Sequence, residues 1–305
     1  HSNFMQPLVT FTRASSPLDS ARDSLSLADS YSMSRSSSPI GENTGKVKKE
    51  FSLLVAELSG EEAFLKLFNY IQGIPYQVLP IRINNPKTGP KEVLDYNSGD
   101  CLSKHYLLAI WLSQLGFKYR FALIPFNWND QPISYSERLK RLAKRLTQAS
   151  WHLYLVVWKD GRWIQIVVTW DSLFKKIGLS PNKNWDGRSE NILAVRALKD
   201  SYPRRFGEAE QVDRFVKEEL RKLSKQEREA YRTFYRELNR WLEQLRKANQ
   251  RRELERQRRY YEAVIGSLWR QDDFNEGMYN DFAHAEAELE RINRQLKELD
   301  REEKE

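Results

Sequence analysis

The sequence predicts an α+β protein in which a buried helix packs on a small antiparallel sheet and a long helical tail follows. Residues 99–116 supply the helix, because their apolar side chains recur at helical spacing after a turn. Apolar runs at 151–158 and 163–170, joined by an Asp-Gly turn, predict a β-hairpin. From residue 207 onward, apolar residues recur every three or four positions among dense charges, which predicts a helical hairpin or coiled coil.

The chain is expected to divide into three parts. Residues 1–46 are rich in serine and lack sustained apolar periodicity, so we expect a disordered leader that cannot offset the entropy of ordering. Residues 47–206 contain the predicted helix and sheet and are expected to form the core domain. Residues 207–305 form a charged helical region, in which aromatic side chains are expected to line the seam between helices. This region offers a route to self-association.

Further elements are expected within the core domain. Residues 47–70 favour two helices, whereas residues 84–90 carry loop signals. A buried strand is predicted at 119–125, and residues 191–198 fit a strand or a helix. Residues 136–147 predict a short basic amphipathic helix. Its leucines suit a core-facing side, although such a helix also suits an acidic partner or a membrane surface.

The positive charge of the chain is carried by its first two thirds. The first 206 residues hold 28 basic and 18 acidic side chains, against 22 and 24 in the remainder. A basic surface favours acidic partners without selecting protein, polynucleotide or lipid, and a solvated surface is its ordinary explanation. The basic segment 246–259 leaves nucleic acid open as a partner, but charge runs on long helices are usually solvated faces.

The residue inventory limits the possible chemistry and location. A single cysteine excludes an intrachain disulfide framework and a cysteine-based zinc site, and we expect neither metal nor cofactor. There is no run of about 18 apolar residues, so no membrane span is expected. No secretory signal is apparent, which slightly favours the cytoplasm, although the chain begins with His1 and upstream processing stays open.

That cysteine, Cys101, is predicted to lie in the first turn of the buried helix. Unbonded N–H groups and the positive end of the helix dipole gather there, and both favour a thiolate. The same N–H groups are placed to hold an oxyanion beside the sulfur. The position therefore indicates a nucleophile.

The cysteine segment resembles the nucleophile helix of the transglutaminase-like superfamily, which groups thiol enzymes with a papain-like Cys–His–Asp arrangement. The first shared motif contains Gly99-Asp100-Cys101, Lys104, Leu107-Leu108 and Leu115-Gly116. The second contains a His that opens a strand, a short turn and a Trp on the next strand, here His152, Asp160-Gly161 and Trp163. The resemblance covers residues 65–175 and implies a papain/transglutaminase-like core.

The resemblance implies that His152 is the base that activates Cys101. His105 competes for this role, because on a helix it lies one turn after the cysteine. Packing or a hydrogen bond near the site is its preferred role. A satisfied histidine at a strand edge is the alternative for His152.

The third catalytic member is where the chain departs from the superfamily. The acid usually stands four residues after the hairpin tryptophan, Trp163, and that position is Val167 here. The nearest downstream acid is Asp171, which shares a strand face with Val167 if the strand is unbroken. We take Asp171 as the expected orienting group. Gln165 is an alternative amide orienter, and Tyr96 is a candidate oxyanion donor.

Two functions from different classes follow from these residues. The first is a thiol enzyme that forms a thioester on Cys101 from an amide of a protein or peptide, and acts as a protease, deamidase or acyl transferase. The second is a catalytically inactive protein of the same fold that binds partners and assembles through its helical tail. The enzyme is the preferred hypothesis.

Overall fold

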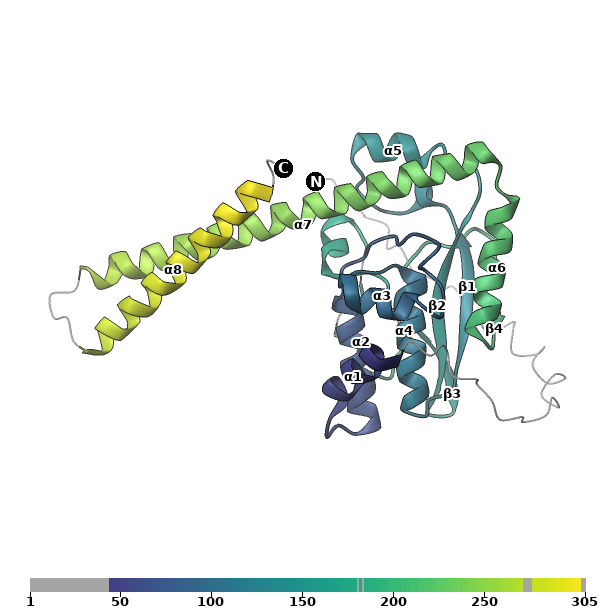
Figure 1. Ribbon diagram of the computed structural model, residues 1–305, viewed down its shortest axis with the longest axis horizontal. Helices are drawn as coiled ribbons and strands as arrows, with labels where there is room; N and C mark the ends of the chain where they lie inside the picture. The colour runs from purple at the N-terminus through teal and green to yellow at the C-terminus, as the bar shows by residue number, and fades with distance from the viewer. Residues whose placement is uncertain (1–43, 180, 183, 271–275, 303–305) are drawn as a thin grey trace, which may run out of the picture. The chain divides into compact units, whose positions relative to one another are not determined.

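The computed structural model describes residues 44–179, 181–182, 184–270 and 276–302 (Figure 1). The predicted leader falls outside the described residues except at its end, where Thr44 already begins a helix. The predicted α+β class is confirmed: helices surround one four-stranded antiparallel sheet.

Four helices precede the sheet. They are α1 (Thr44–Val55), α2 (Gly60–Gly73), α3 (Gly89–Tyr96) and α4 (Cys101–Gln114). The first two confirm the predicted pair, and Ser59 begins α2 with a capping box that it forms with Glu62. The expected loop is confirmed at 84–88, but its last two residues begin α3, and Pro90 is tolerated in the first turn because the N–H that it lacks has no partner within the helix there.

The sheet is built around the predicted hairpin. Its strands are β1 (Tyr119–Phe126), β2 (Ser150–Lys159), β3 (Arg162–Ile166) and β4 (Arg204–Phe206), in the order β3-β2-β1-β4. Both turn residues, Asp160 and Gly161, have positive φ, as a two-residue hairpin turn requires. Strand β3 ends at Ile166, four residues earlier than predicted. Residues 191–198 are neither strand nor helix, and Ala197 alone forms a bridge with Phe126.

Each face of the sheet is covered by a separate apolar cluster. Helices α1, α2, α4 and α6 cover the face that includes Leu153 and Leu155 of β2. The opposite face, which includes Tyr154 and Val156, is covered by three short helices and the first half of α7. The short helices are the 3₁₀ turns η1 (Trp128–Asp130) and η2 (Ser172–Ile177) and the helix α5 (Glu137–Ala143). Helix α5 is the predicted basic helix, but it is shorter than expected.

Three helices form the tail: α6 (Ala209–Lys222), α7 (Lys225–Leu268) and α8 (Glu276–Glu302). They do not stand apart from the core, since α6 and the first half of α7 contribute buried residues to its two apolar clusters. The second half of α7 pairs with α8, and the ion pair between Arg251 and Asp300 (2.6 Å) lies beside their seam. The buried residues of that seam are Leu254, Ile292, Leu296 and Leu299. Self-association through this hairpin stays a prediction.

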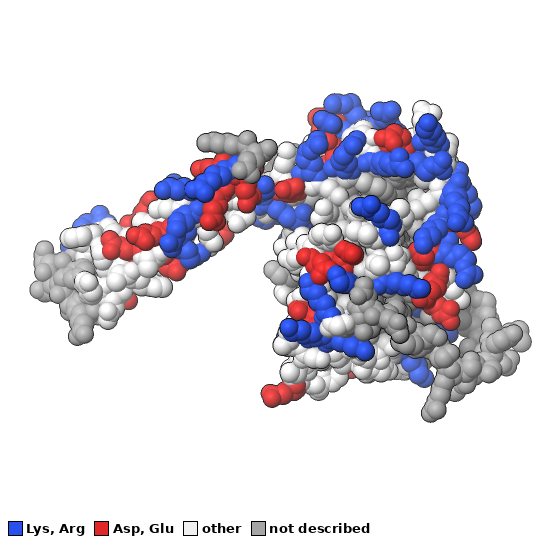
Figure 2. All heavy atoms as spheres, viewed as in Figure 1, with Lys and Arg blue, Asp and Glu red and all other residues white. Residues whose placement is uncertain are grey.

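Basic side chains gather over α5 and the first half of α7 (Figure 2). In α5, Lys140 pairs with Glu137 of its own helix, and Arg138 pairs with Glu237 of α7. Both basic side chains stay exposed beside their partners, so the positive charge of α5 faces solvent. Ion pairs between exposed side chains contribute little to stability. None of the described helices combines the length and the apolar character that a membrane crossing requires.

Candidate functional site

Cys101 lies in the first turn of a helix, as predicted, and is the first residue of α4. Asp100 caps the helix, and its Oδ1 accepts hydrogen bonds from the backbone N–H groups of Leu102 (3.0 Å) and Ser103 (3.2 Å). The other oxygen of Asp100 accepts from Leu79 N and from the side-chain amide of Asn84. The carboxylate is therefore fully engaged, and it fixes the turn that presents the sulfur.

The Cys101 sulfur faces three backbone N–H groups. They belong to Leu153 of β2, to Leu102 and to Cys101 itself, and each lowers the thiol pKa. Although Cys101 is only half-buried, desolvation outweighs them and, together with the Asp100 charge, raises the pKa of the Cys101 thiol to about 12. This pKa favours a neutral thiol and not the expected thiolate, since Asp100 takes the N–H groups of Leu102 and Ser103 at the start of the helix.

His152 comes directly before Leu153 in β2, and the backbone N–H of Leu153 lies near the Cys101 sulfur. Its ring stacks on Tyr154 (6.4 Å between centroids) and meets Phe126 edge-on at the same separation. The His105 ring lies 6.3 Å away. His152 is 1% exposed, and within the described residues its Nε2 has no hydrogen-bond partner. Burial, reinforced by His105, holds its pKa well below the usual value, so the imidazole is neutral.

His105 has no free nitrogen. Its Nε2 accepts a hydrogen bond from Val168 N (3.2 Å), and its Nδ1 therefore carries the proton and donates to the Cys101 carbonyl (2.7 Å). Burial lowers the pKa of His105 to about 3. Both ring nitrogens bond to backbone, so His105 supports the site as predicted.

Protonation of these two histidines should make stability depend on pH. Their pKa values are lowered in the folded protein, so the unfolded chain binds more protons below about pH 6.5. The free energy of unfolding should therefore fall as the pH drops from 6.5 toward 4, by up to about 1.4 kcal/mol per pH unit for each histidine. In urea unfolding, the free energy of unfolding of His152→Phe should depend less steeply on pH than that of the wild type. The difference in slope should correspond to about one bound proton. The exposed His284→Gln is the matched control, and parallel slopes for wild type and His152→Phe would contradict the assignment.

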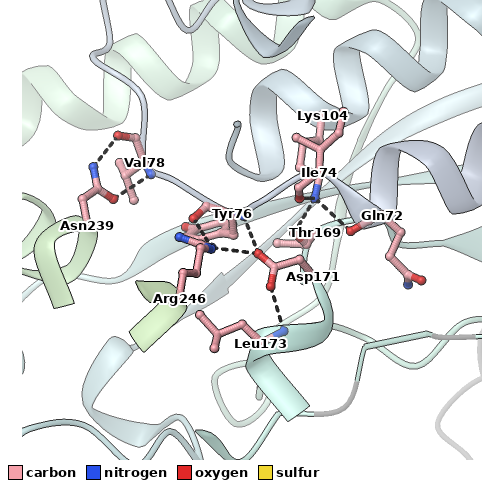
Figure 3. A network of polar contacts seen from close by, with 10 residues as sticks. All are labelled: Gln72, Ile74, Tyr76, Val78, Lys104, Thr169, Asp171, Leu173, Asn239 and Arg246. Atoms are coloured by element: carbon pink, nitrogen blue, oxygen red, sulfur yellow. Dashed lines mark hydrogen bonds and ion pairs between the residues drawn. The ribbon is translucent and has the colours of Figure 1, made fainter. Parts of the chain in front are cut away.

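Asp171 is bound by groups other than His152. Its Oδ1 accepts from Leu173 N (2.8 Å), and its Oδ2 accepts from Tyr76 N (2.6 Å) and from the Arg246 guanidinium (2.8 Å) (Figure 3). None of these bonds reaches the His152 ring, and the orienting role of Asp171 stays a prediction. The unbroken strand on which its offset depends is not present.

The reason is that the chain leaves the sheet directly after Ile166. The N–H of Val167 donates to the Asn191 side chain (2.8 Å), and the N–H of Val168 donates to His105. Neither N–H is left for pairing with β2, so the even spacing between Val167 and Asp171 no longer determines a shared face.

The remaining predicted residues lie away from the histidine. The Gln165 amide donates to the Asn191 carbonyl (2.9 Å). Tyr96 ends α3 and is 64% exposed. Trp163 packs edge-on against Trp158 at the hairpin end of β2. Trp158 is six residues from His152 in the same strand, which is a distance of about 20 Å.

Three aromatic residues near the site were not predicted. Burial is the main cause that raises the pKa of Tyr76 and Tyr235, and the proximity of Cys101 adds to it in both. Trp128 packs against Phe126, and its buried indole N–H lacks a hydrogen-bond partner in the part of the chain that the structure describes. The sequence carries no local signal for them: Trp128 stands in the short 3₁₀ turn η1, and Tyr235 stands in a helix that comes from the distant tail.

No family of known proteins helps to interpret the site: comparison with protein-family models, curated proteins and solved structures finds no match. Among the described residues, no three His, Cys, Asp or Glu side chains come together in a way that could hold a metal ion.

Proposed function

We propose that this chain is a transglutaminase-like thiol enzyme that acts on amide groups of proteins or peptides through a thioester on Cys101. The sequence resemblance and the packing of α4 on a small antiparallel sheet support a papain/transglutaminase-like core. The observation that carries the proposal is the surroundings of the sulfur. Nearby backbone N–H groups, including that of Leu153 in β2, lower the pKa of the Cys101 thiol, and His152, the residue before Leu153, has a buried nitrogen without a partner in the described chain.

These groups suit acyl transfer. The sulfur attacks the amide carbonyl carbon, its proton passes to His152 Nε2, and the carbonyl oxygen takes the negative charge. Because Asp100 already accepts from the N–H groups of Leu102 and Ser103, the backbone N–H groups of Cys101 and Leu153 are the donors left to stabilise that charge. The imidazolium then gives its proton to the amide nitrogen, the C–N bond breaks, and an amine and a Cys101 thioester remain. Water resolves the thioester to an acid, or an amine resolves it to a new amide, and the thiol is restored.

A buried polar atom without a partner is costly, which supports a role for His152 beyond packing. Removing a buried acceptor from water typically costs about 1–3 kcal/mol, and an apolar side chain would avoid that penalty. An incoming thiol proton would give Nε2 its missing partner.

The inactive binding protein is the second candidate, and two observations favour it. Val167 stands where the superfamily places its acid, and the thiol pKa is raised to about 12. A protein that kept the fold without the chemistry would show both.

A trapping experiment distinguishes the two candidates. Full-length protein is incubated with a casein digest and hydroxylamine, then quenched in acid, and its intact mass is measured. The enzyme should give an acyl adduct on Cys101 and peptide hydroxamates in solution, and Cys101→Ser should give neither a thioester nor hydroxamates. Absence of both products from the wild type, under conditions in which Cys101 reacts with iodoacetamide, would favour the inactive protein.

A further inference from the structure

The segment from Pro75 to Leu79 runs beside the cysteine turn like an edge strand. On one side, Gln77 N donates to the Gly99 carbonyl (3.1 Å), and Leu79 N donates to Asp100 (3.3 Å). Tyr76 also forms a parallel bridge with Gly99. Alternate residues of an extended segment direct their backbone groups to opposite sides. One side of this segment is therefore bound to the turn that carries the sulfur.

The other side of the segment is occupied by α7 (Figure 3). Val78 N donates to the Asn239 side-chain oxygen (3.0 Å), and the Asn239 amide nitrogen donates to Val78 O (2.9 Å). Two residues that face each other in an antiparallel sheet exchange an N–H···O bond in each direction, and the Asn239 side chain exchanges the same two bonds with Val78. Asn239 thus takes the place of a peptide group from a neighbouring strand.

Arg246, two turns further along α7, bonds the next residue on the same edge of the segment. Its guanidinium donates to the Tyr76 carbonyl (2.9 Å) and to Asp171 (2.8 Å), which itself accepts from Tyr76 N. The backbone N–H and C=O of both Tyr76 and Val78 are therefore bonded by side chains, and three of these four bonds come from α7. An extended segment paired on one edge only is a template for another strand.

The same helix belongs to the aromatic layer that buries His152. Phe234 and Tyr235 of α7 pack on Trp128, which packs on Phe126, and Phe126 meets the His152 ring. The Tyr235 hydroxyl lies 3.5 Å from the Ser150 hydroxyl, two residues before His152. This layer contributes to the burial that keeps the His152 imidazole neutral.

We propose that the outer edge of Tyr76–Leu79 is the binding site for an extended polypeptide substrate, and that α7 occupies this site in the closed protein. A peptide on this edge would pair with Val78 as Asn239 does, one strand spacing beyond the segment that borders the cysteine turn. The peptide site depends on the proposed thiol chemistry for its purpose but is measurable without it. The site opens when substrate, or a partner that binds the α7–α8 hairpin, displaces Asn239 and Arg246 from the backbone of Tyr76 and Val78.

Labelling of Cys101 tests the proposal in the full chain, because it is the only thiol. Two probes are compared by intact mass: iodoacetamide, and the extended acetyl-Ala-Ala-Ala chloromethyl ketone. The wild type should react slowly with both. Asn239→Ala/Arg246→Ala should react at least tenfold faster with both, and only the tripeptide rate should saturate with probe concentration.

Matched variants separate a peptide-binding edge from a simple cover. Arg240→Ala changes an exposed arginine of α7 that pairs with Glu237 of the same helix, and it should label like the wild type. Val78→Pro, added to the double variant, removes the N–H that a peptide would use. It should lower the tripeptide rate about tenfold and leave the iodoacetamide rate unchanged, and equal losses with both probes would overturn the peptide site.

Circular dichroism and the thermal midpoint establish that each variant is folded, and Asn239→Leu carries the same test if the double variant unfolds. Fast labelling of the wild type, or slow labelling of a folded double variant, would contradict the proposal that α7 restricts access to Cys101. Failure of the proposed enzyme looks different. In that case labelling accelerates as expected, but the casein experiment yields no acyl adduct and no hydroxamate even with the opened variant.

Discussion

Replacing His152 by glutamine is expected to lower the rate of thioester formation on Cys101 by about 10²–10⁴, the usual contribution of a positioned general base. Glutamine keeps a polar side chain of similar length but cannot accept and return a proton at neutral pH. The rate is measured as hydroxamate release from the casein digest, in the wild-type background and in the opened Asn239→Ala/Arg246→Ala background. The effect should appear in both, because it concerns the chemical step.

Tyr154→Phe is the matched control for this prediction. Tyr154 stacks on the His152 ring, and phenylalanine keeps that stacking while it removes the hydroxyl. Its rate should stay within about threefold of the wild type, far from the loss expected of a missing base. Equal losses in both variants would indicate that the aromatic packing is needed and that the imidazole has no chemical role.

The sequence was sufficient to place the central elements because their signals are local. A turn at 97–100 followed by an apolar-periodic run predicted that Cys101 lies in the first turn of a helix, and an Asp-Gly turn predicted the hairpin that carries His152. Each signal depends on residues within one turn or one strand. Neighbouring atoms alone decide such elements.

The end of β3 could not be predicted in the same way. The runs before and after Ile166 are equally apolar, so periodicity continues to favour a strand through residue 170. The strand stops because His105 and Asn191, 63 and 24 residues away in the chain, bond to the N–H groups of Val168 and Val167. Tertiary contacts of this kind override local propensity. The expected shared face of Asp171 and Val167 depended on the strand continuing.

The role of α7 was missed for a different reason. A helix face that packs on a neighbouring helix and one that packs on a sheet have the same spacing of apolar residues. The pattern through Tyr231 and Leu238 therefore fits a coiled-coil seam, but these residues pack on the core, and only the second half of α7 pairs with α8. Asn239 and Arg246 carried no signal, because their partners are backbone groups of Tyr76 and Val78.

Lys104 is a further part of the site whose loss should have a large effect. Its side chain is fully buried, and its Nζ donates to the carbonyl oxygens of Ile74 (2.7 Å), Thr169 (3.1 Å) and Gln72 (3.5 Å) (Figure 3). It joins the end of α2 to the loop before Asp171. These are the two segments between which the N-terminus of α4 is held.

Replacing Lys104 by methionine is expected to lower the free energy of unfolding at pH 7 by about 3–5 kcal/mol, because the substitution fills the same volume but leaves buried carbonyls without donors. Burial lowers the pKa of Lys104 to about 7, whereas the unfolded side chain titrates near 10.5. Between these values the unfolded wild type binds more protons, so its stability rises with pH. The difference in the free energy of unfolding between the wild type and Lys104→Met should therefore grow between pH 7 and 9, by up to about 1.4 kcal/mol per pH unit. Urea unfolding at both pH values measures it, with the exposed Lys118→Met as control, and a loss below about 1 kcal/mol would show that the carbonyls do not depend on the ammonium.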